Sequence, residues 1–379
     1  MKKIIITLLS AAVLLSVFGN NIFAQQKDKD DVDNSSWNGR PAGTWDAVVK
    51  DGIVNIQFYG RYWSEGRDFN AAELGALPMD KVGEFSLTRE AGKVSFKGVF
   101  QDHFGHGTYT FEHNTAFKSW VQQKGYKADD DLMRAVFFTD INKAYFDFMK
   151  ENGYVDISDD QFKDLAEQNM SRKVLEGYFG MFKAEGYGRQ SLEKIVELRE
   201  HGVGPKYIAS IHQMGYKNFS LDQALELRDH GVTADYIATI RKMGYPNLTL
   251  DEAQSLRDRG VTPEYVKNLQ DMGYQGVTLD RAGELRDHGV TPSYISSIKQ
   301  LGYKKISLEQ AQELRDHGVT PGFIKSIGDL GFKDLSLEKA QELRDHGVTA
   351  AFIKKFRDKG VKKSLDEYIR LRDVGFEND

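Results

Sequence analysis

The octapeptide ELRDHGVT decides the fold of this chain, because it occurs verbatim four times, beginning at Glu226, Glu284, Glu313 and Glu342. It lies inside a longer unit that opens with Gly-Tyr or a close variant and recurs every 29 residues, at Gly186, Gly215, Gly244, Gly273, Gly302, Gly331 and Gly360. Self-similarity at such a period is typical of solenoids, in which each unit stacks against its neighbours. Six full units and a truncated seventh are therefore expected to form an array over 186–379.

Each unit is expected to be a pair of short helices joined by this octapeptide. In the unit 215–243, Ser220 is placed to cap a first helix, and Gly231 follows that helix where a left-handed backbone favours glycine. Val232 is expected to be buried, and Thr233 to cap a second helix. Each helix has only about ten residues, so it depends on its neighbours for stability. This structural corner recurs at Gly231 and Thr233, Gly289 and Thr291, Gly318 and Thr320, and Gly347 and Thr349.

The Arg, Asp and His of the octapeptide raise the alternative of a repeated ligand site. The histidine position is held by His201, His230, His288, His317 and His346, and by Arg259 in one unit. Packed helices lie about 8–10 Å apart, whereas a histidine–metal bond is about 2.0–2.1 Å long, so neighbouring histidines are poorly placed to share an ion. The favoured interpretation is a corner in which His or Arg complements the carbonyl end of its helix and Arg–Asp ion pairs follow the array. A ligand-binding surface remains the alternative.

The first 24 residues, MKKIIITLLSAAVLLSVFGNNIFA, have the composition of a secretory signal peptide. Lys2 and Lys3 precede an apolar run, and Ala24 supplies the small residue before an expected cleavage at Gln25. The polar stretch 25–43 is expected to be a flexible linker. The chain has no cysteine, which excludes a lipid-carrying cleavage site and thiolate metal ligation. The sequence therefore predicts a periplasmic or secreted protein with no membrane span after signal removal.

Residues 44–115 alternate between apolar and polar side chains, as strands with one buried face do. Val54, Ile56 and Phe58 form one such run, and others lie at 85–88, 94–100 and 108–111, with turns expected at 90–93 and 105–107. Over 116–185 the apolar spacing becomes helical, and Gly-Tyr pairs at Gly125 and Gly153 indicate divergent helical repeats. The predicted fold class is α+β, mainly α. A small N-terminal antiparallel β meander is followed by an αα-solenoid of 29-residue helix-turn-helix repeats.

The sequence favours a binding protein over an enzyme. It contains no phosphate-binding loop, dinucleotide fingerprint, nucleophile elbow or HExxH motif, and no cofactor is expected. Residues 186–379 hold 29 Lys and Arg against 29 Asp and Glu, so they form no basic groove for nucleic acid. The alternative is an envelope enzyme or metal-binding protein with a site in the β-rich domain. Its candidate ligands are His103, His106 and His113, because their spacing would let three imidazoles meet across a turn.

Partner specificity is expected at positions of the second helix that differ between units, because recurring positions build the frame. The first such row is Lys206, Asp235, Glu264, Ser293 and Gly322, and the second is Ser210, Thr239, Asn268, Ser297 and Ser326. The leading functional prediction is protein or peptide binding, or scaffolding, through the solenoid surface.

The repeat LRDHGVTPxYI…GY and the block FSLTREAGKVSFKGVFQDHFGHGTYTF together resemble a family of exported bacterial helical-repeat proteins. The repeat is also similar to those in extracytoplasmic regions of metallopeptidase-type sensor receptors of the beta-lactam-sensing kind. The resemblance covers residues 45–379 and implies an interaction role in the cell envelope. The peptidase motif of those receptors is absent here, so the resemblance implies no catalytic residue.

Overall fold

The computed structural model describes residues 43–60 and 63–375. The predicted signal peptide lies outside these residues, and so does the predicted linker except for Gly43. The chain divides into two compact units, one ending at Asn169 and the other running from Met170 to Asp379. Antiparallel strands come first and helices with 29-residue spacing follow, which confirms the predicted α+β, mainly α fold class.

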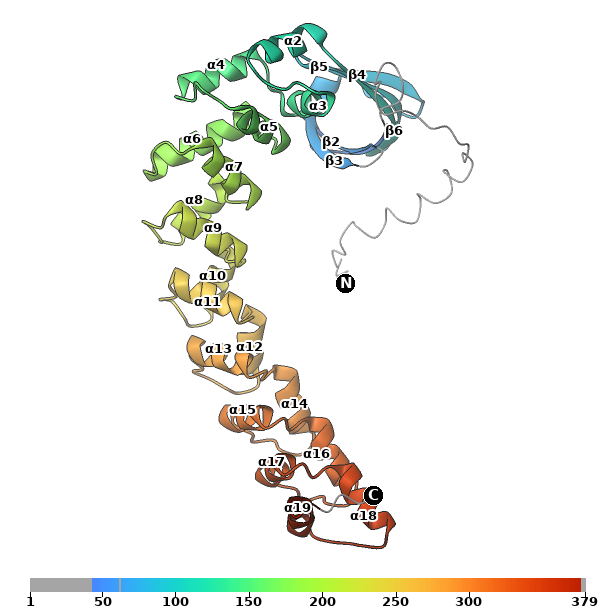
Figure 1. The fold of residues 1–379 in the computed structure, drawn as a ribbon, viewed down its shortest axis with the longest axis vertical. Helices are drawn as coiled ribbons and strands as arrows, with labels where there is room; N and C mark the ends of the chain where they lie inside the picture. Colours follow the sequence, from blue (N-terminus) through green and yellow to red (C-terminus); the bar gives the residue numbers. More distant parts are fainter. Residues whose placement is uncertain (1–42, 61–62, 376–379) are drawn as a thin grey trace, which may run out of the picture. The chain divides into compact units, whose positions relative to one another are not determined.

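Six strands of the first unit form one antiparallel sheet in the order β3-β2-β1-β6-β5-β4. The sheet consists of two three-stranded meanders joined through the pairing of β1 with β6, and it curves into a half-barrel (Figure 1). The short helix α1 (Ala71–Leu74) contacts the edge strands β3 and β4. The strands are β1 (Gly43–Lys50), β2 (Ile53–Tyr59), β3 (Ser64–Asn70), β4 (Gly83–Arg89), β5 (Gly92–Gln101) and β6 (Phe104–His113).

Aromatic side chains fill the buried face of this sheet. Trp45 lies with its ring centroid 5.5 Å from that of Phe85, and the Phe58 centroid lies 4.8 Å from that of Phe138 on a covering helix. Such aromatic contacts add to the free energy gained by burying apolar area. The buried set includes Trp45, Val54, Ile56, Phe58, Phe85, Leu87, Val94, Phe96, Phe100 and Tyr109.

The turn predicted at 105–107 was wrong, because the chain turns two residues earlier, between β5 and β6. Gly105 and Gly107 lie inside β6 and serve close packing instead. A Cβ atom at Gly107 would lie 2.1 Å from the Lys97 carbonyl oxygen, and one at Gly105 would lie 2.4 Å from the Phe100 ring. These glycines therefore permit a close approach of the neighbouring strand and ring.

Four helices complete the first unit: α2 (Thr115–Gln123), α3 (Asp130–Thr139), α4 (Lys143–Glu151) and α5 (Asp159–Glu167). Between α3 and α4, Asp140 takes the left-handed conformation with φ 58°, Ile141 is buried, and Asn142 caps α4. These three residues reproduce the Gly, Val and Thr of the regular corner. Asp is among the residues that tolerate this backbone conformation, so the upstream corner forms without the sequence signature.

The second unit begins with α6 (Arg172–Glu185) and continues as alternating first and second helices of the repeats (Figure 1). The first helices are α7 (Leu192–Glu200), α9 (Leu221–Asp229), α11 (Leu250–Asp258), α13 (Leu279–Asp287), α15 (Leu308–Asp316), α17 (Leu337–Asp345) and α19 (Leu365–Asp373). The second helices are α8 (Pro205–Gln213), α10 (Ala234–Lys242), α12 (Pro263–Asp271), α14 (Pro292–Gln300), α16 (Pro321–Gly328) and α18 (Ala350–Asp358).

Each second helix contacts the second helix of the next repeat, from α8 to α18. The first helices carry a row of alanines that are fully buried: Ala224, Ala253, Ala282, Ala311 and Ala340. Stacking therefore supplies the burial that a nine-residue helix lacks by itself. Within the described residues, no helix has the length and apolar content needed to cross a bilayer.

Candidate binding surfaces of the solenoid

The corner residues of the octapeptide shape the backbone between the two helices of a repeat. Gly231 has φ 71°, Val232 is fully buried, and the Thr233 hydroxyl accepts a hydrogen bond from the Tyr236 N–H. The other three verbatim copies repeat this geometry, with positive φ at Gly289, Gly318 and Gly347 and capping by Thr291, Thr320 and Thr349.

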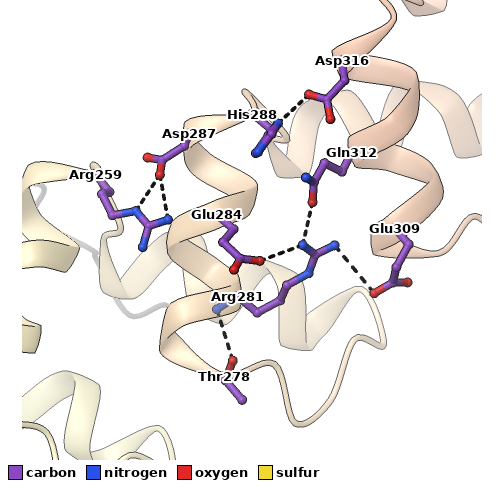
Figure 2. Close-up of polar contacts among 9 residues, drawn as sticks. All are labelled: Arg259, Thr278, Arg281, Glu284, Asp287, His288, Glu309, Gln312 and Asp316. Atoms are coloured by element: carbon purple, nitrogen blue, oxygen red, sulfur yellow. Dashed lines mark hydrogen bonds and ion pairs between the residues drawn. The ribbon is translucent and has the colours of Figure 1, made fainter.

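The histidine of each corner bonds to the aspartate of the next corner. His288 Nδ1 lies 2.5 Å from an Asp316 carboxylate oxygen, and Arg259 Nη2 replaces the imidazole at 2.7 Å from Asp287 (Figure 2). The hydrogen bond to Asp229 raises the pKa of His201 above its ordinary value. The same bond joins His201 to Asp229, His230 to Asp258, His317 to Asp345 and His346 to Asp373.

From Arg228 to Arg372, the arginine at this position of each first helix lies on an aromatic ring of the preceding repeat. The Arg257 guanidinium carbon is 5.3 Å from the centroid of the Tyr236 ring, and the Tyr236 hydroxyl donates to the Val261 carbonyl at 2.9 Å. Among the described residues, the ion pairs of the corner row run from His or Arg259 to Asp, so the expected pairing from the octapeptide arginine is wrong. Burial raises the pKa of Tyr207, Tyr236, Tyr265 and Tyr294 to about 12.

The first row of variable positions on the second helices is open to solvent. Lys206, Asp235, Glu264, Ser293 and Gly322 are all exposed. In the second row, the Ser210, Thr239, Ser297 and Ser326 hydroxyls donate to carbonyls of their own helices, and Asn268 is half-buried. The first row therefore presents side chains of different charge and size to solvent.

A second surface follows the loops between repeats. In five units, the tyrosine that follows the opening glycine donates its hydroxyl hydrogen to a carbonyl in the next loop, as Tyr274 does to Ile306 at 2.7 Å. In three units a cation from the second helix covers the aromatic ring of this position: Arg241 over Tyr216, Lys299 over Tyr274 and Arg357 over Phe332.

The loop of one repeat borders a groove of about 620 Å³, which no motif in the sequence predicts. Its lining includes Tyr245, Pro246, Glu252, Gln270 and Asp280. The signal in the sequence is the column Arg241, Gln270, Lys299 and Gly328, in which the cation is present in alternate units.

The three candidate metal ligands of the β-rich domain do not come together. His103 lies in the β5–β6 turn, and His106 and His113 lie in β6, seven residues apart and on opposite faces of the sheet. That separation corresponds to about 24 Å along a strand. His113 lies 3.7 Å from the Asp130 carboxylate instead. Across residues 43–60 and 63–375, no three His, Cys, Asp or Glu residues form a group that could hold a metal.

Comparison with known proteins adds no functional assignment to this geometry. No protein-family model matches the chain, and a search of curated proteins finds no match either.

Proposed function

We propose that this protein is a non-enzymatic exported module that binds a protein or peptide partner, or holds partners together, through its solenoid surface. The observation that supports the proposal is that each repeat uses different residues for contacts with its neighbours and for the exposed surface. The recurring His, Asp, Arg and Tyr side chains bond to the adjacent repeat, whereas the exposed row at 206, 235, 264, 293 and 322 differs in chemistry from repeat to repeat. A surface of this kind gives specificity without altering the frame that presents it.

Charge reversal on the second helices tests the proposal. The variant Asp235→Lys with Glu264→Lys changes two exposed side chains of the row, and Lys206 shows that lysine fits the equivalent position of α8. A matched control is Glu226→Lys with Glu313→Lys, which makes the same change in charge on two exposed positions of the first helices. The full chain and both variants would be used to capture partners from envelope extracts, because the expected signal peptide places the partner there.

We expect the wild type and the control variant to capture a partner. We expect the second-helix variant to lose it. Rim charges act mainly through the association rate, so a loss of roughly tenfold in affinity is expected. If both variants capture the same partners as the wild type, the second-helix surface is not the binding surface. If circular dichroism shows that the control is folded and it also loses the partner, the effect is not specific to the proposed row.

A further inference from the structure

The groove between the loops that follow α10 and α12 indicates which kind of partner side chain binds there. This inference rests on the proposed partner binding. We propose that the groove at Tyr245 takes an arginine side chain of the partner. The groove lies between the loop that joins α10 to α11 and the loop that joins α12 to α13, and it has a volume of about 620 Å³. Tyr245 spans the two loops, because its hydroxyl donates to the Val277 carbonyl at 2.5 Å.

Neighbouring repeats show what the face of such a tyrosine binds. Arg241 lies 4.7 Å from the Tyr216 centroid, and its guanidinium also donates at 2.7 Å to the carbonyl of Met214, the C-cap residue of α8. Lys299 places its ammonium 4.6 Å from the Tyr274 centroid and donates to Met272 at 3.1 Å. The side chain at the position of Arg241 and Lys299 thus does two things. It donates a hydrogen bond to the carbonyl that follows the preceding second helix, and it places a cation over the tyrosine ring.

In the Tyr245 repeat, Gln270 holds this position and makes only the hydrogen bond to the carbonyl. Its amide donates to the Met243 carbonyl at 3.3 Å, but it is neutral. Among the residues that the structure describes, no cation lies over the Tyr245 ring. The electron-rich face of a tyrosine attracts a guanidinium, by about 0.5–1 kcal/mol at exposed sites and more where water is excluded. The ring therefore presents a face that the equivalent rings of two neighbouring repeats use for a cation.

The charges around the groove favour the same ligand. Glu252 and Asp280 are the charged residues among the described residues that line it. The position of Glu252 is basic in three other repeats, where Lys194, Arg281 and Lys339 pair with carboxylates. Figure 2 shows Arg281 with its partners Glu284 and Glu309. At the groove, the two positions that hold a basic residue in several other repeats are occupied by Glu252 and Gln270, neither of which is a cation.

The two carboxylates have hydrogen-bonding capacity for a ligand. Glu252 Oε2 accepts from the backbone N–H of Thr249 at 2.8 Å and from its hydroxyl at 3.0 Å, so Oε1 remains for a partner. The Asp280 carboxylate accepts no hydrogen bond from any described residue. A guanidinium has a planar set of donors that matches carboxylates and a flat face that stacks on rings, which favours arginine over lysine.

A neighbouring repeat suggests a substitution that would block the groove. Gln270→Arg copies Arg241 and places a guanidinium over Tyr245 from within, so it fills the proposed site while keeping the bond to Met243. Gly328→Arg is the matched control, because it introduces the same side chain at the equivalent position two repeats away. Glu252→Gln removes one carboxylate and preserves the helix cap, as Gln310 does with Ser307.

The test uses the full-length protein and an acetylated, amidated pentapeptide, Gly-Ser-Arg-Ser-Gly, with a citrulline version as the neutral isostere. Binding would be followed by the amide resonances of Gly244 and Gly276, which line the groove. The arginine peptide is expected to shift both resonances in a saturable way in the wild type and in Gly328→Arg. Gln270→Arg is expected to abolish the shifts, and Glu252→Gln to weaken the affinity roughly tenfold.

Several outcomes would overturn the inference: equal binding of the citrulline peptide, unchanged binding by Gln270→Arg, or no saturable shift in the wild type. Unchanged resonances outside the groove would show that each variant is folded. The proposed function fails separately. If the second-helix charge reversal removes a captured partner and Gln270→Arg does not, the groove assignment is wrong and partner binding by the solenoid stands. If the peptide occupies the groove but neither charge-reversal variant affects capture, the second-helix row is wrong and the groove assignment stands.

Discussion

A single tyrosine illustrates how one residue joins two repeats. Tyr236 is buried on the second helix α10, and its hydroxyl donates to the carbonyl of Val261 in the following corner. Arg257 of that following repeat covers its ring. Phenylalanine occupies the same position in two later repeats, at Phe323 and Phe352, and Arg344 and Arg372 still cover these rings. The stacking is thus present in all these repeats, and the hydroxyl is the part that varies.

The variant Tyr236→Phe isolates the contribution of that hydroxyl. We expect it to lower the free energy of unfolding by about 1 kcal/mol, because the buried Val261 carbonyl loses its donor while the ring and its cation remain. The reverse change, Phe323→Tyr, is expected to stabilise the array by supplying a donor toward Val348. Guanidinium unfolding followed by circular dichroism measures both. Equal midpoints for the wild type and both variants would show that these hydrogen bonds contribute nothing.

At the scale of the helix, capping differs in one informative case. Thr233, Thr262, Thr291, Thr320 and Thr349 each accept a hydrogen bond from a backbone N–H of the second helix that follows. The equivalent residue before α8 is Gly204, which has no side chain to accept such a bond. Its φ of −99° and ψ of 173° suit a residue with a Cβ atom, and the nearest atom to that Cβ would be 4.0 Å away.

Two substitutions test the energetic weight of these caps. Thr233→Ala is expected to destabilise the protein by about 1 kcal/mol, because the first turn of α10 loses its acceptor. Gly204→Thr is expected to stabilise it by roughly a few tenths of a kcal/mol, since glycine is itself a tolerable cap. Thermal unfolding of both variants beside the wild type is the measurement. A stabilising Thr233→Ala or a strongly destabilising Gly204→Thr would contradict this account of the corner.

The elements that the sequence predicts well are those whose signals are local. Gly231, Val232 and Thr233 each have a property that suits the corner without reference to any distant residue. Strand β3 (Ser64–Asn70) could not be recognised in this way, because its sequence SEGRDFN contains a single buried apolar residue, Phe69, and depends on pairing with β2. The sequence places Gly107 in a turn, since the neighbouring strand that requires its small size is ten residues away at Lys97.

The candidate site was harder to predict than the fold for the same reason. The sequence identifies the histidine row but does not show that each imidazole meets an aspartate 27 or 28 residues further on. Sequence periodicity directs attention to positions that recur, whereas the Tyr245 groove depends on a residue that departs from its column. Gln270 is unremarkable by itself, and its meaning follows only from seeing Arg241 and Lys299 above the equivalent rings.

The solenoid unit as a whole is expected to be sensitive to alkali. Burial raises the pKa of Tyr207, Tyr236, Tyr265 and Tyr294 from 10.0 to about 12, so the folded state favours their neutral form. A group with a raised folded-state pKa contributes stability that is complete below its unfolded pKa and is lost as the pH rises through the folded value. Stability should therefore decline between pH 10 and pH 12.

Parallel titrations of tyrosinate absorbance and helical circular dichroism measure this decline. The expected result is that the buried phenols ionise together with loss of helix. Replacing all four tyrosines by phenylalanine should flatten the alkaline part of the stability curve, although the variant starts from a lower stability at neutral pH. Ionisation of every tyrosine near pH 10 with the helices intact would contradict the burial that the structure shows.

The contacts between repeats occur at nearly constant offsets along the chain: 25 residues for the helix tyrosine, 28 for the histidine (27 for His346) and 32 for the loop tyrosine. A consequence concerns length. If residues 244–272 were removed as a block, the Tyr236 hydroxyl would meet the carbonyl of Val290 and His230 would meet the carboxylate of Asp287. These residues are the equivalents, in the next repeat, of the present partners Val261 and Asp258. We expect the frame to tolerate insertion or loss of whole units, because each contact would find an equivalent partner in the next unit. Loss of the third unit would also remove Tyr245 and Gln270, so a change in length would preserve the frame and change the binding positions that the array presents.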